Sequence, residues 1–395
     1  MEGILHGVKI IDLSRVLAGP FCTMILGDLG AEVIKIENLS NGDDTRGWGP
    51  PFIEGESAYY LCANRNKKGM TINLKSEKGK EILKKLISTA DIVVQNFKPG
   101  TLDRMGLGYS QLKKVKEDII VASVSGFGTN GPYAHLPGYD YIIQAMSGLM
   151  SITGDKESDP VKTGVAISDV LTGLFTCIGI LGALHHRNRT GEGQELDISL
   201  FDSQLAAMVN VASNYLCSGS IPNRMGNQHP NIVPYQTFSA SDGDLVIAVG
   251  NDEQFRKFSR LLGREELSSS KRYGTNAARL QNKAELVFII AAEMKKKSKK
   301  EWKYLLDKEG IPNGPIYNIK EALESEQAKA RDMVVSMKHP KIPDLKLVGS
   351  PLKFSKTPVF MKLSPPLHGE HTEEILEGLG YSQDEIIAMQ HNQWI

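Results

Sequence analysis

The stretch "VKIIDLSRVLAGPFCTMILGDLGAEVIKIE", residues 8–37, indicates the fold class. The short apolar run "VKIIDL" is typical of a buried strand, and "EVIKIE" at residues 32–37 is typical of a second one. Between them, "GPFCTMILGDLGA" at residues 19–31 has helical character, with Pro20 near its start, where proline is tolerated. The stretch therefore predicts one β-α-β unit, and its two strands should run parallel.

The same alternation continues along the chain. The amphipathic segment "SEKGKEILKKLISTA" (76–90) leads into "DIVVQNF" (91–97), and "YSQLKKVKEDII" (109–120) leads into "VASVSGFG" (121–128). A long apolar helix is expected from Asp169 to about Arg187, followed by the turn "RNRTGEGQ" and the strand "ELDISLF" (195–201). We therefore predict an α/β protein with a Rossmann-like large domain built on a parallel sheet.

A chain of 395 residues exceeds one ordinary domain. We expect the large domain over residues 1–205 and a linker, rich in Gly, Pro, Ser and Asn, over 206–228. A smaller α+β domain should follow over 229–325, with a hairpin around Asp242-Gly243. Residues 326–395 then form a further linker and a C-terminal segment.

Composition limits the partners and the setting. The 46 basic and 46 acidic residues cancel, so there is no global charge to attract nucleic acid or an anionic membrane surface. The four cysteines are widely spaced and the N-terminus lacks the basic region of a signal peptide, so a reduced, cytoplasmic setting is expected. The uncharged run from Val170 to Leu184 is shorter than the roughly 20 residues of a membrane span, and a buried core helix is expected there.

Several common site motifs are absent or stand in the wrong context. "GFGTNG" (126–131) has the spacing of a dinucleotide-binding loop, but Pro132 and Pro137 follow where that loop must open a helix. No histidine pair has zinc-binding spacing, and no G-x-S-x-G motif supports a serine hydrolase, so no metal is expected. Glu37 stays open between a ribose-binding acid and an ordinary surface carboxylate at a strand end.

Asp169 is the most interesting acidic residue, because it begins an otherwise apolar helix with Ser168 before it. It can be a helix-capping acid. It can also be a nucleophile that the helix N-terminus keeps ionised, with backbone N–H groups near the oxyanion formed during acyl transfer. The residue pattern alone leaves both interpretations open.

Motif by motif, the sequence resembles the class III CoA-transferases, the family of formyl-CoA transferase and carnitine CoA-transferase. The resemblance begins at residues 7–37 and includes "GDDTRGWGPPF", "NRNKKGMTINLK", "VVQNFKPGTLDRMGLGY" and "SGFGTNGPYAHLPGYDYIIQAMSGLM". It continues through "GVAISDVLTGLF" and "RTGEGQELDISLFDSQ" to "GIPNGPIYN", "VGSPLKFSKTP" and "PPLHGEHTEEIL". So many ordered motifs make coincidence implausible, and they extend over almost the whole chain.

The resemblance implies a function for particular residues. The aspartate of "GVAISDVLTG" is the family's nucleophile, which is Asp169 here. The CoA site is then expected to comprise Val16, Leu17, Ala18, Ile72, Lys75, Asn96, Phe97, Lys98, Arg104 and Tyr139. Coenzyme A would be a substrate, with no permanently bound cofactor. The resemblance further implies a homodimer whose two chains are linked like rings, with residues 326–395 returning to the large domain.

Some positions depart from the formyl-CoA transferases. Asn38 and Pro137 stand where those enzymes have cations that hold phosphate, so Lys35, Arg65, Lys67 or Lys68 could substitute. The segment "GNQHPNIVPYQTF" replaces their glycine-rich loop, and resembles the succinate-hydroxymethylglutarate type, which acts on dicarboxylic acids. Such an acceptor needs cations or hydrogen-bond donors for its second carboxylate. The expected candidates are Arg46, Arg65, Arg224, His229 and Tyr235.

Two alternatives to a dicarboxylate CoA-transferase remain. One is an α-methylacyl-CoA racemase, but the racemases carry a histidine where this chain has Tyr139, and tyrosine is a poor base near neutral pH. The other is a CoA-binding protein without catalysis, against which an intact Asp169 argues. The expected ligands in the favoured case are an acyl-CoA, with succinyl-CoA as donor, and a small carboxylic acid such as glutarate or 3-hydroxy-3-methylglutarate.

Overall fold

The computed structural model describes residues 2–395, and the chain divides into two compact units. The larger unit comprises Met1–Leu149, Lys162–Ser220 and Glu326–Ile395, and the smaller unit comprises Met150–Val161 and Ile221–Ser325. The division differs from the predicted boundaries at two places. Residues 150–161 belong to the smaller unit, and residues 206–220 are not a linker but include helix α10 (Val209–Ser218) of the larger unit.

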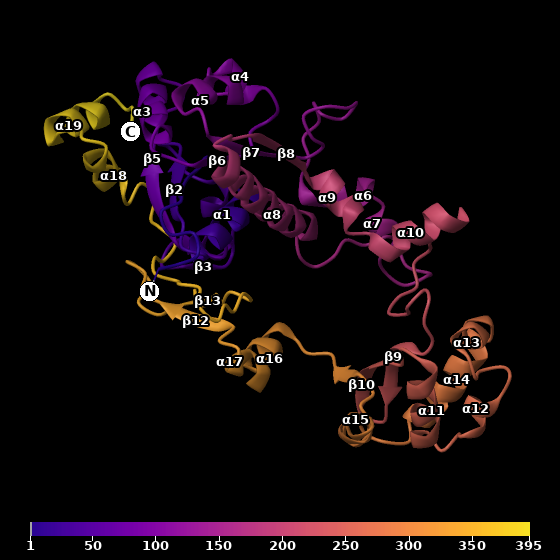
Figure 1. Ribbon diagram of the computed structural model, residues 1–395. Coiled ribbons are helices and arrows are strands. Elements are labelled where there is room, and N and C mark those ends of the chain that lie inside the picture. The colour runs from indigo at the N-terminus through magenta and orange to yellow at the C-terminus, as the bar shows by residue number, and fades with distance from the viewer. Residues whose placement is uncertain (1) are drawn as a thin grey trace. The chain divides into compact units, whose positions relative to one another are not determined.

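A six-stranded parallel sheet with the order β5-β2-β1-β6-β7-β8 forms the centre of the larger unit (Figure 1). Its strands are β1 (Lys9–Asp12), β2 (Glu32–Glu37), β5 (Lys67–Thr71), β6 (Ile92–Gln95), β7 (Ile120–Ser125) and β8 (Glu195–Ser199). Ile10 of β1 lies opposite Val33 on one side and Ile92 on the other, so β1 is a central strand. The predicted parallel α/β class is confirmed, and only β5 was not foreseen as a strand.

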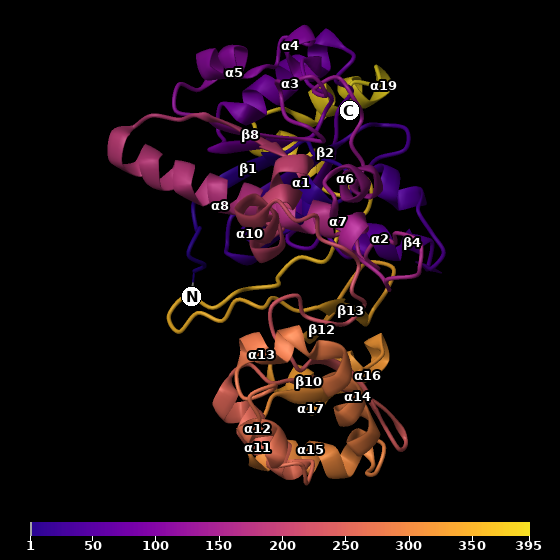
Figure 2. The same cartoon turned by 90° about the vertical axis from the view of Figure 1, so that its right-hand side faces the viewer.

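Helices cover both faces of this sheet. On one face, α1 (Ala18–Asp28) packs against α8 (Ile167–Thr190), and both contribute to a core cluster with β1, β2 and β6. The other face is covered by helices from both ends of the sequence (Figure 1 and Figure 2): α3 (Glu77–Ile87), α5 (Tyr109–Val115), α18 (Thr372–Gly378) and α19 (Gln383–His391). Residues 326–395 are therefore part of the larger unit's core.

Helix α8 is apolar throughout, but only one of its faces is buried. Thr172, Thr176, Cys177, Ile180 and Leu184 face the core, whereas the large side chains on the other side are 37–63% exposed: Leu174, Phe175, Ile178 and Leu181. The expectation of a fully buried core helix at residues 170–184 is therefore corrected to a helix with one apolar face uncovered. Among residues 2–395, α8 is also the one helix long and apolar enough to fit a membrane span.

The smaller unit is α+β. Its antiparallel sheet, of order β11-β10-β9, is built from β9 (Tyr235–Ala240), β10 (Gly243–Ala248) and β11 (Asn313–Pro315). The pairing of Gly243 with Ala240 closes a hairpin at the predicted position. Five helices pack on this sheet around Phe255, Phe258 and Trp302: α11 (Asp252–Leu261), α12 (Glu266–Ser269), α13 (Asn276–Gln281), α14 (Lys283–Met294) and α15 (Lys299–Lys308).

Short elements complete the chain. In the first half they are η1 (Asp44–Gly47), β3 (Phe52–Ile53), β4 (Glu56–Ser57), α2 (Ala58–Leu61), α4 (Thr101–Arg104), α6 (Asp140–Met146) and α7 (Leu149–Ile152). In the second half they are α9 (Leu200–Ala206), α16 (Ile319–Glu324), α17 (Glu326–Ala330), β12 (Val334–Met337) and β13 (Leu345–Val348).

The "GFGTNG" segment does not open a helix, since the next helix after β7 is α6, which begins at Asp140. Gly126 and Gly138 explain the glycine content of this loop instead. A Cβ built on Gly126 would lie 2.5 Å from the Cα of Gly138, so only glycine allows the two ends of the loop to meet there. The loop closes on itself just before Tyr139 and Asp140, which places both residues beside the carboxyl end of β7.

Candidate active site

The site forms where the sheet order turns back, at the carboxyl ends of β1 and β6. This is the position at which open parallel sheets bind their ligands. The loops after the two strands hold each other through backbone groups of Arg15: its N–H donates to Oδ1 of Asn96 at 2.9 Å, and its carbonyl accepts from Nδ2 of Asn96 at 2.7 Å. Asn96, expected to contact CoA, therefore also fixes the loop after β1.

Val16 follows in that loop with a backbone conformation that its side chain disfavours. Its φ is +70°, in the left-handed region, where a β-branched residue is an outlier that costs about 1–3 kcal/mol. Its N–H points at the carboxylate of Asp43, 3.2 Å from Oδ1 and 3.3 Å from Oδ2. Leu17 is then the N-cap of α1, and Ala18 is its first residue.

Asp169 lies in the first turn of α8, where its carboxylate meets the N-terminus of α1. The backbone N–H of Ala18 lies close to this carboxylate and favours its ionised form. Burial raises the pKa of Asp169 to about 7 together with the nearby charge of Asp140, and the Ala18 N–H only partly offsets them. A carboxylate in this state is poorly solvated, and a poorly solvated anion is a stronger nucleophile than one in water.

Two features bring α8 into this position. Gly173 lies one turn after Asp169, and a Cβ on it would lie 2.8 Å from the Ala18 carbonyl oxygen, so glycine permits the close approach of the two helices. The N-cap of α8, Ala166, supplies no side-chain bond. Asp140 of α6 takes over this role, because its Oδ1 accepts from the Ser168 N–H at 2.8 Å while its Oδ2 accepts from the Gln144 amide at 2.7 Å.

Tyr59 of α2 is a further neighbour of the nucleophile. Burial, followed by the charge of Asp169, raises the pKa of Tyr59 to about 12. Its phenol is therefore a neutral O–H group at physiological pH, and its ring packs edge-on against Trp48 with the centroids 5.2 Å apart. Tyr59, Asp140 and Asp43 were not selected from the sequence, although each lies in or beside a quoted family motif.

The residues expected to contact CoA lie around these loops, but they differ in access. Lys75, Lys98 and Arg104 are exposed, and Tyr139 is 61% exposed, so all four side chains are available to a ligand. Phe97 is partly buried against the sheet core. Ile72 is 1% exposed and packs in that core, so only its backbone could meet a ligand.

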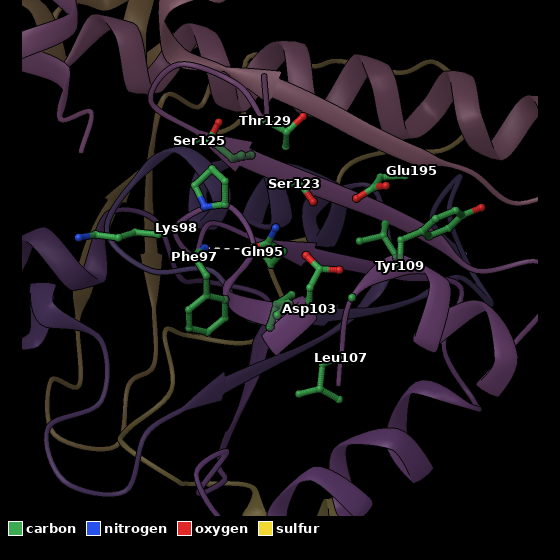
Figure 3. A pocket seen from close by; sticks show the side chains of 16 residues that line it. Gln95, Phe97, Lys98, Asp103, Leu107, Tyr109, Ser123, Ser125, Thr129 and Glu195 are labelled. Carbon is green, nitrogen blue, oxygen red and sulfur yellow. Dashed lines mark hydrogen bonds between the residues drawn. The ribbon is translucent and has the colours of Figure 1, made fainter. Parts of the chain in front are cut away.

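Figure 3 shows a pocket that runs along β7 and includes Phe97 and Lys98, which follow β6. Asp169 does not line it. Its wall includes Asp103 and Glu195, and burial, then Asp103 and Asp197, raises the pKa of Glu195. Because carboxylates repel phosphate, the phosphates of CoA are expected on the exposed side, near Lys98 and Arg104, rather than deep in this pocket.

Arg46 and Arg65 are not free to bind a substrate. Arg46 donates two bonds to Glu37, from Nε to Oε2 at 2.8 Å and from Nη2 to Oε1 at 2.7 Å, and it stacks over Tyr60. Arg65 binds Asp28 in the same two-pronged way, at 2.9 and 2.6 Å. Both guanidinium groups already have a carboxylate partner, which favours a structural role over the predicted substrate-binding one. Glu37 is correspondingly neither a ribose ligand nor a surface acid.

The cations suggested as substitutes for the phosphate clamp are also engaged. Lys35 and Lys67 are 0% exposed and paired with Asp43 and Asp12, at 2.8 and 3.1 Å. Lys68 is partly exposed but bonds Glu374 at 2.7 Å. Lys35 and Lys67 therefore serve the protein interior, and Lys68 is held by an acid at the surface, which argues against a role of these three lysines in binding phosphate.

The three remaining substrate candidates lie in the smaller unit. His229 and Tyr235 pack ring against ring, with centroids 5.0 Å apart, and the His229 N–H bonds the Tyr235 carbonyl at 3.1 Å. Arg224 Nε donates to the Asp155 carbonyl at 3.2 Å and has no acidic partner within ion-pair distance among residues 2–395. Over the same residues, no cluster of three or more metal-binding side chains occurs.

Comparison with known proteins adds evidence independent of this geometry. A succinyl-CoA:glutarate CoA-transferase of Mus musculus is 45% identical over 383 residues, covering 97% of this chain and 88% of that protein. A succinate–glutarate CoA-transferase of Agrobacterium fabrum is 42% identical over 381 residues, with 95% of each chain covered. A solved structure of a CAIB/BAIF family protein from Brucella suis is 43% identical and matches with a TM-score of 0.85, covering 96% of this chain and 100% of that one. The family model for CoA-transferase family III matches residues 5–372, and the chain therefore belongs to this family of CoA-transferases.

Proposed function

We propose that the protein transfers CoA from succinyl-CoA to glutarate or a related dicarboxylic acid, with Asp169 as the covalent nucleophile. The observation that supports the mechanism is the placement of the Asp169 carboxylate in a poorly solvated position against the Ala18 N–H. The names of the relatives, which act on succinyl-CoA and glutarate, support the choice of substrates. Tyr139 stands where the racemases carry a histidine base, which argues against the racemase alternative.

The proposed reaction has two mirror-image halves. A carboxylate oxygen of Asp169 attacks the thioester carbonyl of succinyl-CoA, CoA leaves as its thiolate, and a mixed anhydride forms. The thiolate then attacks the aspartyl carbonyl, which releases succinate and leaves an aspartyl-CoA thioester. Glutarate attacks this thioester to give a second anhydride and free thiolate. Attack of the thiolate on the glutaryl carbonyl yields glutaryl-CoA and regenerates the Asp169 carboxylate.

Ala18 contributes to the steps at the aspartyl carbonyl. Its N–H lies close to the free carboxylate, where it can donate to the oxygen that becomes an oxyanion when the thiolate attacks. This donor lies at the N-terminus of α1, where the helix dipole also favours negative charge. No reorganisation is needed at the moment of reaction, which is the main advantage of such a preset donor.

The second carboxylate of a dicarboxylic acceptor needs a cation or hydrogen-bond donors. Arg46 and Arg65 are occupied by Glu37 and Asp28, which leaves Arg224, with His229 and Tyr235, as the proposed recognition group. A cation that pairs with the second carboxylate in the closed site would be left unpaired by a monocarboxylate, which would disfavour that acceptor by roughly 2–5 kcal/mol. The proposal therefore predicts a large preference for glutarate over butyrate.

We propose a homodimer in which the two chains are linked like rings. The support is the family resemblance together with the uncovered apolar face of α8, which carries Leu174, Phe175, Ile178 and Leu181. A second copy of the chain that packs on this face is the simplest way to remove its apolar side chains from water. Sedimentation at micromolar concentration tests this proposal, and a stable monomer would contradict it.

The four free cysteines agree with a reducing cytoplasm, the setting that we propose.

The function is tested by incubating the protein with succinyl-CoA and either glutarate or butyrate and following the CoA esters by mass spectrometry. Glutaryl-CoA should form much faster than butyryl-CoA. Arg224→Met should raise the KM for glutarate about tenfold or more and leave the KM for butyrate nearly unchanged. Arg65→Met is the matched control, because it removes a guanidinium that we place with Asp28. Equal kcat/KM values for the two acids in the unaltered protein would contradict the dicarboxylate assignment.

A further inference from the structure

Two buried, charged side chains, Lys35 and Asp43, bond the backbone of the turn after β1. Asp43 is 2% exposed and Lys35 0%, and Lys35 Nζ bonds Oδ2 of Asp43 at 2.8 Å. Lys35 Nζ also bonds the carbonyl of Ser14 at 2.8 Å, while the Asp43 carboxylate accepts from the Val16 N–H. The ion pair therefore holds the backbone on both sides of Arg15.

Asp43 itself is fixed in place by further bonds. Its Oδ1 accepts from the N–H of Thr45 at 3.0 Å and from the hydroxyl at 2.7 Å, and its own N–H donates to Glu37 at 2.7 Å. Burial would raise the pKa of Asp43, but Lys35 and the Thr45 bonds outweigh it and lower this pKa to about 2. The carboxylate is thus ionised and rigid at any physiological pH.

The held turn leads directly into the donor at the nucleophile. Only Leu17 separates Val16, with its φ of +70°, from Ala18, whose N–H lies close to the carboxylate of Asp169. If the Val16 peptide relaxed out of the left-handed region, the first turn of α1 would be redirected, and the Ala18 N–H with it. The Val16 conformation is unfavourable on its own, so something must maintain it.

We propose that Asp43, held by Lys35, is a positioning residue that keeps Val16 left-handed and thereby aligns the Ala18 N–H with Asp169. Asp43 does not touch substrate in this scheme. It acts through the backbone of three consecutive residues, and its effect is on the chemical steps rather than on CoA affinity. The inference rests on the proposed function, because it assigns the aligned donor to acyl transfer at Asp169.

The test is a double-substitution cycle with Asp43→Asn and Val16→Gly. Asp43→Asn should lower kcat for succinyl-CoA and glutarate by about ten- to a hundredfold, because small misplacements of a catalytic donor have effects of this size. Glycine adopts positive φ without strain, so the Val16→Gly background no longer needs the Asp43 bond. In that background, the decrease in log kcat caused by Asp43→Asn should be less than about a third of the decrease it causes in the unaltered protein.

Asp28→Asn is the matched control. Asp28 is also a buried acid with a buried cationic partner, Arg65, but it lies at the other end of α1 from Ala18. This substitution should lower the melting temperature and leave kcat within about twofold. If Asp43→Asn does not fold, Asp43→Glu takes its place in the cycle, since it keeps the charge for Lys35 while displacing the carboxylate from Val16.

Amide hydrogen exchange gives a readout that does not require activity. Asp43→Asn should accelerate exchange in the peptide that contains Val16 and Ala18, and Asp28→Asn should not. An equal loss of kcat with and without Val16→Gly, or unchanged exchange at these amides, would overturn the positioning role. The proposed function fails separately, if the unaltered protein makes no glutaryl-CoA, and the exchange result would still decide the role of Asp43.

Discussion

The two units of the chain bury different kinds of side chain. The larger unit encloses a set of charged groups on its strands, with Asp12, Lys35 and Lys67 all 0% exposed. The core of the smaller unit is formed by apolar and aromatic residues, and Arg279 is the one charged residue of that unit which is buried within the described chain. Charges in the larger unit hold loops at the site, whereas apolar packing dominates the core of the smaller unit.

This difference indicates what buried ion pairs contribute. Taking charges out of water costs several kcal/mol per ion, so such pairs are poor sources of net stability. Their value lies in fixing one arrangement of the groups they bond. Lys35 and Lys67 each also bond a backbone group of the site: Lys35 donates to the Ser14 carbonyl at 2.8 Å, and Lys67 donates to the Pro20 carbonyl of α1 at 2.9 Å. The predictions below test this contrast.

The largest effect is expected at Asp169, the proposed nucleophile. Asp169→Ala should reduce CoA transfer by at least about 10³-fold, because the covalent route is lost, while CoA affinity changes little. Hydroxylamine added after succinyl-CoA should label Asp169 in the unaltered protein. Steady-state kinetics and peptide mass spectrometry measure both effects, and substantial transfer by the Ala variant would contradict the covalent mechanism.

The next effect compares one buried cation from each unit. Lys67→Met leaves Asp12 buried and unpaired, and should lower the free energy of unfolding by roughly 3–5 kcal/mol. Arg279→Met should cost roughly 1–3 kcal/mol, since it leaves two buried carbonyls unpaired while its acidic partner, Asp252, stays half exposed. Urea denaturation of both variants measures this difference. An equal decrease in the free energy of unfolding of the two variants would contradict the proposed difference between the units.

The raised pKa of Asp169 also has a consequence for stability. A carboxyl group whose pKa rises from 3.8 to about 7 on folding is destabilising when ionised, so the penalty is absent below pH 4 and complete above pH 7. Asp169→Asn should therefore raise the free energy of unfolding by roughly 2–4 kcal/mol at pH 8 and by little at pH 4. Thermal unfolding at the two pH values measures this, and a variant that is less stable at pH 8 would contradict the assigned direction.

The smallest effect concerns Asp140, the second charge that raises this pKa. Since the nucleophile must be ionised, kcat/KM should fall as the pH drops below about 7. Asp140→Asn keeps an oxygen that can accept the Ser168 N–H, but removes the negative charge, so the acidic limb should move down by about one pH unit. A pH-rate profile of both proteins provides the test. A lower rate at every pH without a shift would show that Asp140 acts only as a helix cap.

Much of the larger unit was predictable because its signals are local. Residues 8–37 fold as the predicted β-α-β unit, and the apolar segment after Asp169 forms α8. The fate of individual charges was not predictable, because it depends on distant partners. Arg65 meets Asp28 across 37 positions, and Lys67 meets Asp12 across 55. A lysine in a strand is normally interpreted as a surface residue. Only the parallel register of β1, β2 and β5 shows that Lys35 and Lys67 are buried.

The exposed face of α8 illustrates the same limit in another form. A helix that is apolar on every side has no periodic pattern, so the sequence cannot show which face meets the sheet. The structure places Ile180 inward and leaves Ile178 63% exposed. Among the site residues, Asp169 was identified through its motif, whereas Asp43 and Asp140 were missed because their roles depend on backbone groups that the folded chain brings to them.

The return of residues 326–395 to the larger unit affects how the protein is synthesised. Ile375, Leu376 and Ile386 share one cluster with Ile11, yet the ribosome produces them only after the whole smaller unit. At about 5–20 residues per second, the nascent larger unit waits many seconds with that apolar face uncovered. During this interval the smaller unit can fold first. Because its apolar face is exposed, we expect the incomplete larger unit to bind chaperones during synthesis.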